Sequence, residues 1–250
     1  MRNIDVVILN PSVLKSVRDT AVLGARITQR SKNIHNLDDF NTLWNKKYSE
    51  SFVENIMDLP HPTLQKFAKI NVAVIGASRR VLAQLTRHQY GVHFMSGSLQ
   101  YGDFSDASDV VIPEGLSEED KQEYLKLHEH SVAVYKKFAN TYGTDIAGYA
   151  TLNGMRNVLL ISAEPFELKH MIRQRICRRN TAETRLVMLK IWQALYELDP
   201  VMFSIETTGT CCQCGHCEEG KFSCGSPLPV GATPIDIIAM DFGGINADTD

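Results

Sequence analysis

Residues 69–101 constrain the fold more than any other part of the chain. The segment KINVAVIG (69–76) is apolar, rich in β-branched residues and closed by a glycine, which predicts a buried strand. Ser78 follows directly and can cap a helix that runs to about Arg87. Gly91 helps to end that helix, and we interpret the Gly/Ser-rich residues after it as a loop.

Other segments add helices and one more strand. The run IDVVIL (4–9) predicts a buried strand, and residues 103–115 predict a loop broken by Pro113 and Gly115. Ser117 begins a capping pattern for a helix that stops at Gly143. On that helix we expect a buried face made by Leu127, Val134 and Phe138. The chain is again helical from about residue 167, and a last long helix ends at Leu198, before Asp199-Pro200.

This mixture of many helices and few strands predicts an α+β fold. The 250 residues suffice for a large core, and 44% apolar with 22% charged residues is typical of globular proteins. We expect a main domain over residues 1–205, a Cys-rich segment over 206–230 and an acidic tail over 231–250. Neither a membrane-length apolar run nor a signal peptide is evident, so we expect a cytoplasmic protein.

Charge is distributed unevenly along the chain. The net charge is −3, yet arginines crowd the stretch from Arg173 to Arg185. A local basic cluster in a mildly acidic protein suits small phosphorylated ligands better than long nucleic acids.

Arg87 and His88 are the first candidate ligand-binding residues. A guanidinium beside an imidazole suits a phosphate or an anionic ring, and backbone amides of Ser96, Gly97 and Ser98 can bind a further anion. The structural alternative is a helix C-terminus, where cations are favoured by the macrodipole, followed by a surface loop. The residues by themselves leave both interpretations open.

Four motifs in series resemble those of the flavin-dependent thymidylate synthases. The central one is an Arg-His-Arg signature with a following Ser, matched here by Arg87, His88 and Ser98, with Gly76, Ser78, Arg79, Gln84, Leu85 and Tyr101 around them. Upstream, PHPT matches a His-x-Ser/Thr motif at His61 and Thr63. Downstream, the matching residues are His170, Arg175, Cys177, Glu183 and Arg185. A Cys-rich ending of some members matches residues 212–225.

The resemblance implies a particular reaction. The family methylates dUMP at C5, with methylenetetrahydrofolate as one-carbon donor, reduced FAD as hydride source and NADPH as reductant. It also implies an α+β protomer of long helices with a small, mostly antiparallel sheet, assembled as a homotetramer. No enzyme nucleophile is required, because the cofactors carry the chemistry and the protein aligns them.

The resemblance also assigns expected roles, position by position. Contacts to the flavin are expected from His61, Thr63, Arg87, His88, Gln89 and Arg175. Contacts to the nucleotide are expected from Gln84, Ser98, Gln100 and Arg185. Arg185 is expected to be the catalytic donor to the anionic pyrimidine edge. Arg87, His88, Arg175 and Arg185 should therefore converge on one cleft.

Several positions depart from the family pattern. Gln89 and Gln100 stand where the family has Arg, Lys66 stands where it usually has Glu, and Glu164-Pro165-Phe166 replaces Asn-Ala-Arg. Each loss of Arg removes a charge and a bidentate fork. Two alternatives follow: a sibling flavin enzyme that modifies C5 of another pyrimidine nucleotide, for example by hydroxymethylation, or a non-catalytic nucleotide- or nucleic-acid-binding homologue.

The cysteines cluster near the C-terminus. Cys211, Cys214, Cys217 and Cys224 include C-x-x-C pairs with zinc-ligand spacing, although the second pair of a zinc ribbon is missing. A structural zinc site, a disulfide or redox use, and unligated thiols remain open.

Overall fold

A four-stranded antiparallel sheet forms the centre of the computed structural model, which describes residues 4–59, 61–208 and 211–243. Its strands are β1 (Asp5–Ile8), β2 (Ile70–Ser78), β3 (Val92–Ser96) and β4 (Arg156–Ala163), in the order β1-β2-β4-β3. Each neighbouring pair is antiparallel. The predicted strands at 4–9 and 69–76 are therefore confirmed, as is the expected sheet type.

Helices make up most of the remaining chain. The α-helices are α1 (Val13–Arg30), α2 (Leu37–Trp44), α3 (Glu50–Met57), α4 (Arg79–Leu85), α5 (Glu118–Tyr142), α6 (Thr144–Ala147), α7 (Pro165–Arg175), α8 (Ala182–Leu198), α9 (Ile205–Thr208), α10 (Cys211–Cys214) and α11 (Pro234–Phe242). Short 3₁₀ helices are η1 (Ser31–Asn33), η2 (Pro62–Gln65), η3 (Gly148–Ala150) and η4 (Gly220–Phe222). In the described residues, no helix combines the length and apolarity needed to span a membrane.

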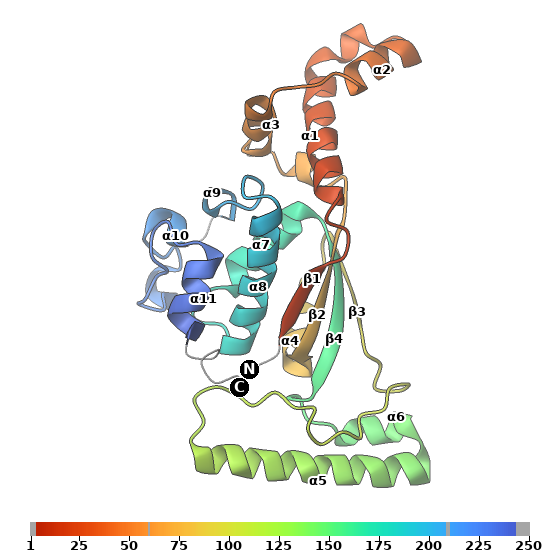
Figure 1. Ribbon diagram of the computed structural model, residues 1–250, viewed down its shortest axis with the longest axis vertical. Coiled ribbons are helices and arrows are strands. Elements are labelled where there is room, and N and C mark those ends of the chain that lie inside the picture. Colours follow the sequence, from red (N-terminus) through yellow and green to blue (C-terminus); the bar gives the residue numbers. More distant parts are fainter. Residues whose placement is uncertain (1–3, 60, 209–210, 244–250) are drawn as a thin grey trace.

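The core lies between one face of the sheet and α7 and α8. Figure 1 shows these helices with α11 on one side of the sheet, α1 to α3 at one end of the molecule and α5 at the other. Val74 and Ile161 from the sheet meet Leu168 of α7 and Trp192 of α8 in a fully buried cluster. The indole nitrogen of Trp192 donates to the Phe203 carbonyl at 2.8 Å, which satisfies the polar atom of this buried ring.

The opposite face of the sheet is apolar but exposed. The register aligns Val7 with Ala73, Ile75 with Val158, and Met95 with Leu160, so these side chains share one face. Five of these residues are large and exposed: Val7, Ile75, Met95, Val158 and Leu160. We call this surface the open sheet face. Contiguous exposed apolar surface of this kind marks an interaction site.

Local capping chemistry sets the helix boundaries as predicted. The side chain of Ser78 accepts from the Val81 amide at the start of α4, and that of Ser117 accepts from the Asp120 amide at the start of α5. Gly143, at a φ of 94°, ends α5 in a conformation that residues with a side chain rarely adopt.

Two expectations about the fold were wrong. The residues after Gly91 form strand β3, because they pair with β4 far along the chain. The buried face of α5 is made by His128, Ser131, Val132 and Tyr135, whereas Leu127 is exposed. The helix packs against α6 and η3, and the Tyr135 hydroxyl donates to the Gly102 carbonyl.

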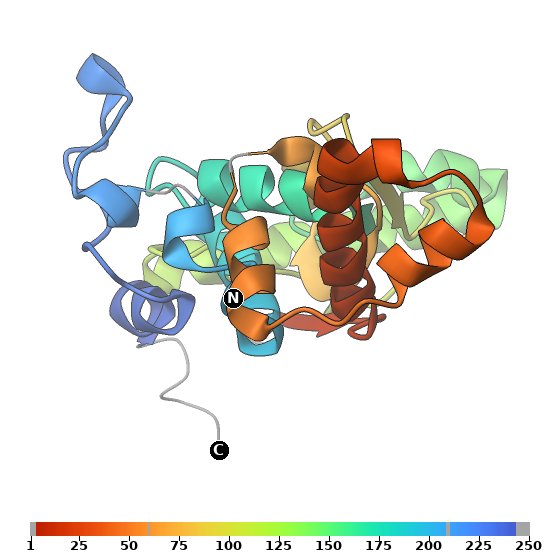
Figure 2. The same ribbon diagram turned by 90° about the horizontal axis from the view of Figure 1, so that it is seen from above.

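The C-terminal segment folds against α8. Helix α11 packs on α8, begins with a Thr233–Asp236 capping box, and buries Ile237 and Phe242. In Figure 2, the stretch that holds α10 and η4 projects from the body of the molecule. The proposed boundaries at residues 205 and 230 stay predictions.

Candidate functional site

Helix α7 carries the polar residues at the centre of the candidate site. It starts directly after β4, with Pro165 at its first position, where the absent N–H costs no hydrogen bond. Glu167 and His170 lie three residues apart and therefore on one face of the helix. Arg175 lies at the C-terminal end, where a cation is favoured by the helix dipole.

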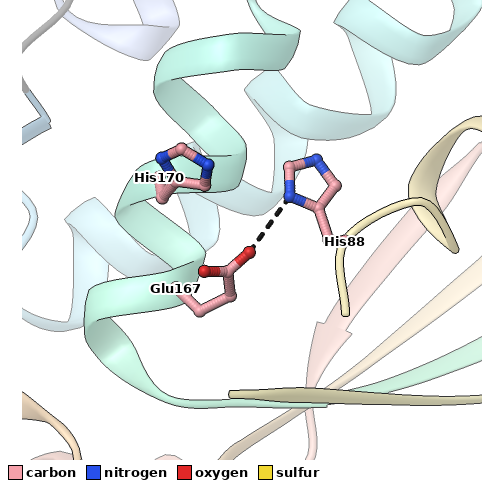
Figure 3. Close-up of side chains that lie close together, drawn as sticks. All are labelled: His88, Glu167 and His170. Atoms are coloured by element: carbon pink, nitrogen blue, oxygen red, sulfur yellow. Dashed lines mark hydrogen bonds and ion pairs between the residues drawn. The ribbon is translucent and has the colours of Figure 1, made fainter. Parts of the chain in front are cut away.

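His88 reaches this face of α7 from the turn after α4. Its ring is buried between two partners. Nδ1 lies 3.0 Å from Oε1 of Glu167 (Figure 3), and Nε2 lies 3.1 Å from Nε of Arg175. A guanidinium can only donate, so Nε2 is the acceptor and Nδ1 carries the hydrogen that Glu167 accepts. Arg175 also donates to the Gln84 carbonyl at 3.0 Å. The imidazole is thus held in one tautomer and one orientation.

Burial decides the charge of this pair. Desolvation, with the nearby charges of Arg175 and His170, lowers the pKa of His88 to about 4. Desolvation and the neighbouring Glu164 raise the pKa of Glu167 above its usual range. Near neutral pH His88 is therefore a neutral imidazole, and its contact with Glu167 is a hydrogen bond rather than an ion pair.

A polar cavity of about 670 Å³ opens beside these residues, lined by Gln84, Arg87, His88, Gln89, Tyr90, Glu167, His170, Gln174 and Arg175. Two guanidinium groups, two imidazoles and three amides give it the character of a site for an anionic, ring-containing ligand. His170 also lines a neighbouring cavity of about 940 Å³, together with His61, Phe166, Lys169 and Arg173. The two cavities share α7 as a common wall.

The structure thus brings together some of the residues that were predicted to bind the flavin and the nucleotide. Gln84, Arg87, His88, Gln89 and Arg175 line the first cavity, and His61 lines the second. Thr63, in η2, is exposed and lines neither of these two cavities. The side chain of Gln84 is occupied by its neighbours, since its Oε1 accepts from Thr184 Oγ1 at 2.9 Å.

Ser98 and Gln100 lie in the loop beyond β3, away from this cavity. The Ser98 hydroxyl accepts from the Gln100 amide at 3.2 Å, and the Gln100 carbonyl accepts from Thr144 of α6. Both side chains are exposed. Within one protomer they form a separate polar surface next to α6.

Arg185 does not join the cleft that we predicted for it. Its guanidinium is buried, donates to Asp241 of α11 and to the Ile176 carbonyl, and lies over the Phe242 ring. Asp241 also accepts from Arg178 at 2.8 Å. Helix α11 therefore supplies the counter-charge that a ligand was expected to supply, and these contacts support a structural role.

The four predicted metal-binding cysteines are not gathered into a site. Cys214 donates to the His216 carbonyl, Cys224 donates to the Ser226 carbonyl, and Cys211 accepts from the Leu228 amide. Of the described residues, three His, Cys, Asp or Glu ligand atoms meet within 4.8 Å only at His88, Glu167 and His170. The geometry gives the expected zinc site no support, because three of these thiols do not come within 4.8 Å of one another.

Sequence reasoning missed Glu167 as a partner of His88. The available signal was Glu-x-x-His on a predicted helix, a spacing that places both side chains on one helical face.

Comparison with known proteins identifies the family. Residues 13–201 match the family model Thy1, described as thymidylate synthase complementing protein. The chain belongs to the Thy1 family. The resemblance inferred from the four motifs is therefore confirmed, and with it an enzyme of the thymidylate synthase type.

Two Thy1 relatives illustrate how distant the likeness is. The flavin-dependent thymidylate synthase of Geobacter sulfurreducens is 24% identical over 184 residues, which cover 72% of this chain and 78% of the relative. That of Thermococcus onnurineus is 25% identical over 188 residues, covering 70% and 75%.

Solved Thy1-like structures share the fold. The UMP/dUMP methylase PolB from Streptomyces cacaoi, bound with 5-Br dUMP, superimposes with a TM-score of 0.61 at 16% identity, covering 84% of this chain and 96% of PolB. ThyX from Helicobacter pylori, with FAD and dUMP, gives a TM-score of 0.57 at 16% identity, covering 82% and 99%. At these identities the superposition establishes the fold alone.

Proposed function

We propose that this chain is a flavin-dependent enzyme that methylates C5 of a pyrimidine nucleotide, with dUMP as the default substrate. The observation that carries the proposal is the cavity in which His88 is fixed between Glu167 and Arg175, with Arg87 beside it. A Thy1 relative in Helicobacter pylori is described with FAD and dUMP, ligands that carry phosphates and polar ring edges.

The residues present fit a flavin nucleotide. Arg87 and Arg175 offer two permanent positive charges for phosphates or for an electron-rich ring edge. His88, neutral near pH 7, adds a polar group whose position is fixed by its two partners. Bound FAD, reduced by NADPH, would supply the hydride that converts the one-carbon unit of methylenetetrahydrofolate into a methyl group.

The chain's own task is alignment and electrostatic stabilisation. Arg175 is fixed by the Gln84 carbonyl and by His88, so its charge is held at the cavity wall before any ligand arrives. Preorganised donors of this kind need little rearrangement during the reaction. We assign His61 and Thr63, near the second cavity, to the flavin and folate side of the same site.

A second candidate is a sibling activity on another pyrimidine nucleotide. Gln89 and Gln100 lack the charges of the family signature, and the structurally similar PolB is described as a UMP/dUMP methylase. A neutral amide in place of a guanidinium weakens anion binding by about 1.5–3 kcal/mol per lost contact, so the preferred nucleotide can change.

We also propose that the active form is a homotetramer. Ser98 and Gln100 lie apart from the cavity within one protomer, and the open sheet face offers an apolar surface for a second copy. A site built from several subunits would return these residues to the ligand.

Flavin binding and product analysis test the proposal. The purified protein should be yellow or take up added FAD, and titration with dUMP and UMP should perturb the flavin spectrum. Incubation with methylenetetrahydrofolate and NADPH, followed by nucleotide analysis, then separates methylation from hydroxymethylation. A colourless protein that binds neither FAD nor any pyrimidine monophosphate would refute the proposal and favour a non-catalytic homologue.

A further inference from the structure

Three side chains from two segments approach each other at the wall of the first cavity. His88 comes from the turn after α4, and Glu167 and His170 come from α7 (Figure 3). One ligand atom from each lies within 4.8 Å of the other two. His88 and Glu167 are buried, whereas His170 is exposed to the cavity.

We propose that His88, Glu167 and His170 form a binding site for a divalent transition-metal ion of the zinc class, with one coordination position open to the cavity. The inference concerns metal binding by the protein itself and does not depend on the proposed reaction.

The donor set fits such an ion. Two imidazole nitrogens and one carboxylate oxygen are a frequent zinc ligand set, and three protein ligands leave a position for water or another ligand. Bonds of about 2.1 Å in a tetrahedral arrangement place the ligand atoms about 3.4 Å apart. His88 Nδ1 and Glu167 Oε1, at 3.0 Å, already lie close to that spacing. A small turn of the exposed His170 ring completes the set.

The scaffold holds the ligands before an ion arrives. Glu167 and His170 are three residues apart on α7, so the helix fixes their relative position. The buried ring of His88 stands nearly perpendicular to that of His170, at 78°, with the ring centres 5.7 Å apart. Two of the three ligands thus lose little conformational entropy on binding.

Arg175 must respond when an ion binds. Its Nε now donates to His88 Nε2, so the imidazole hydrogen sits on Nδ1. An ion bound at Nδ1 takes the place of that hydrogen, which moves to Nε2, and Arg175 then loses its acceptor and turns away. The proposal therefore predicts competition between the ion and this one hydrogen bond.

The open position would receive an anionic or neutral donor from the cavity. The ion would also return a positive charge to a site where Gln89 stands in place of the Arg of the family signature. A phosphate oxygen is a suitable fourth ligand.

Equilibrium dialysis of the full-length protein against Zn²⁺, followed by metal analysis, tests the site. We expect one ion per chain. Glu167→Gln and His170→Asn should each weaken binding by more than the roughly 10–100-fold that loss of a hydrogen-bond partner of a ligand costs. Arg175→Met should strengthen binding, because it removes the competing donor. Thermal unfolding of each metal-free variant verifies that it is folded.

Two controls separate this site from other metal-binding groups. His61→Asn removes a histidine that lines the neighbouring cavity and should leave the ion bound. Replacing Cys211, Cys214, Cys217 and Cys224 with Ser should also leave it bound, and a Co²⁺-loaded protein should show no thiolate charge-transfer band. Absence of a bound ion, binding that survives both Glu167→Gln and His170→Asn, or binding lost with the cysteines would overturn the proposal. None of these measurements requires flavin, so their failure is distinct from failure of the proposed reaction.

Discussion

Lys169 illustrates how one charged side chain in the wall of a cavity can lower the stability of the fold. Its side chain lies on α7 beside the second cavity, only 6% of the residue is exposed, and Nζ lies 5.7 Å from the centre of the Phe203 ring. Burial lowers the pKa of this amine to about 8, partly offset by Asp199 and Asp58. At neutral pH the amine is therefore charged in a place that disfavours charge.

Lys169→Met should raise the free energy of unfolding at pH 7. The variant keeps the apolar stem and removes the desolvated charge, so we expect a gain on the order of 1–3 kcal/mol. The unfolded chain binds more protons than the folded one between pH 8 and about 10.4, so wild-type stability rises with pH there. Urea denaturation at pH 7 and pH 10 should show the gain shrinking at the higher pH; an equal gain at both would contradict this explanation.

Arg175 should matter to ligand binding far more than a surface arginine. Arg175→Ala removes a positioned charge from the cavity wall and should weaken flavin binding roughly 10- to 100-fold, as measured by fluorescence quenching. Arg179→Ala is a matched control, because Arg179 is exposed and donates to the Phe222 carbonyl elsewhere. Similar losses in both variants would indicate a general charge effect instead.

Among the helices, α11 stabilises the fold through one carboxylate, that of Asp241. Asp241 lies between Arg178 and Arg185, and burial acts to raise its pKa, but the hydrogen bonds from both arginines together hold it below the usual range. The carboxylate therefore makes its full contribution to the free energy of unfolding above about pH 4. This contribution is lost as the pH falls through the lowered pKa of Asp241 in the folded protein.

Asp241→Asn should cost about 3–5 kcal/mol of unfolding free energy, because it leaves the Arg185 guanidinium buried without a counter-charge. Chemical denaturation at pH 7 measures the loss. Asp19→Asn, which breaks the exposed pair with Lys15, is the control and should change stability by less than about 1 kcal/mol. A loss at position 241 no larger than the control would mean that α11 is not anchored by this pair.

Elements set by local chemistry were predictable, and those set by distant partners were not. Ser78, Ser117 and Gly143 mark helix ends through their own side chains or backbone, so the sequence revealed them. Strand β3 depends on pairing with β4, about 70 positions away by its register of Val92 with Ala163, and was interpreted as a loop. Likewise, Arg87, His88 and Arg175 were recognised by motif, whereas the partner of Arg185 comes from α11, outside any motif.

On the scale of the whole molecule, the open sheet face is the feature that a lone protomer leaves unexplained. Val158→Lys places a charge on this face, beside Ile75 of the paired strand, and should weaken self-association roughly tenfold or more, because burying an unpaired charge is costly. Sedimentation velocity over a concentration series measures the effect. Leu37→Lys, at an exposed position on α2, should leave the assembly intact. Assembly that is unchanged by Val158→Lys would place the interface elsewhere.

The contacts of α11 with Arg178 and with Arg185 of α8 determine where this protein can be shortened. The family model matches residues 13–201, yet Arg178 donates to Ser226, Pro227 and Asp241, which all lie beyond that range. Cutting the chain at residue 201 would deprive Arg178 and Arg185 of the counter-ion that they share, Asp241, and would expose the apolar surface that Phe242 covers. A shortened version that keeps the fold therefore has to retain α11 and the segment that leads to it.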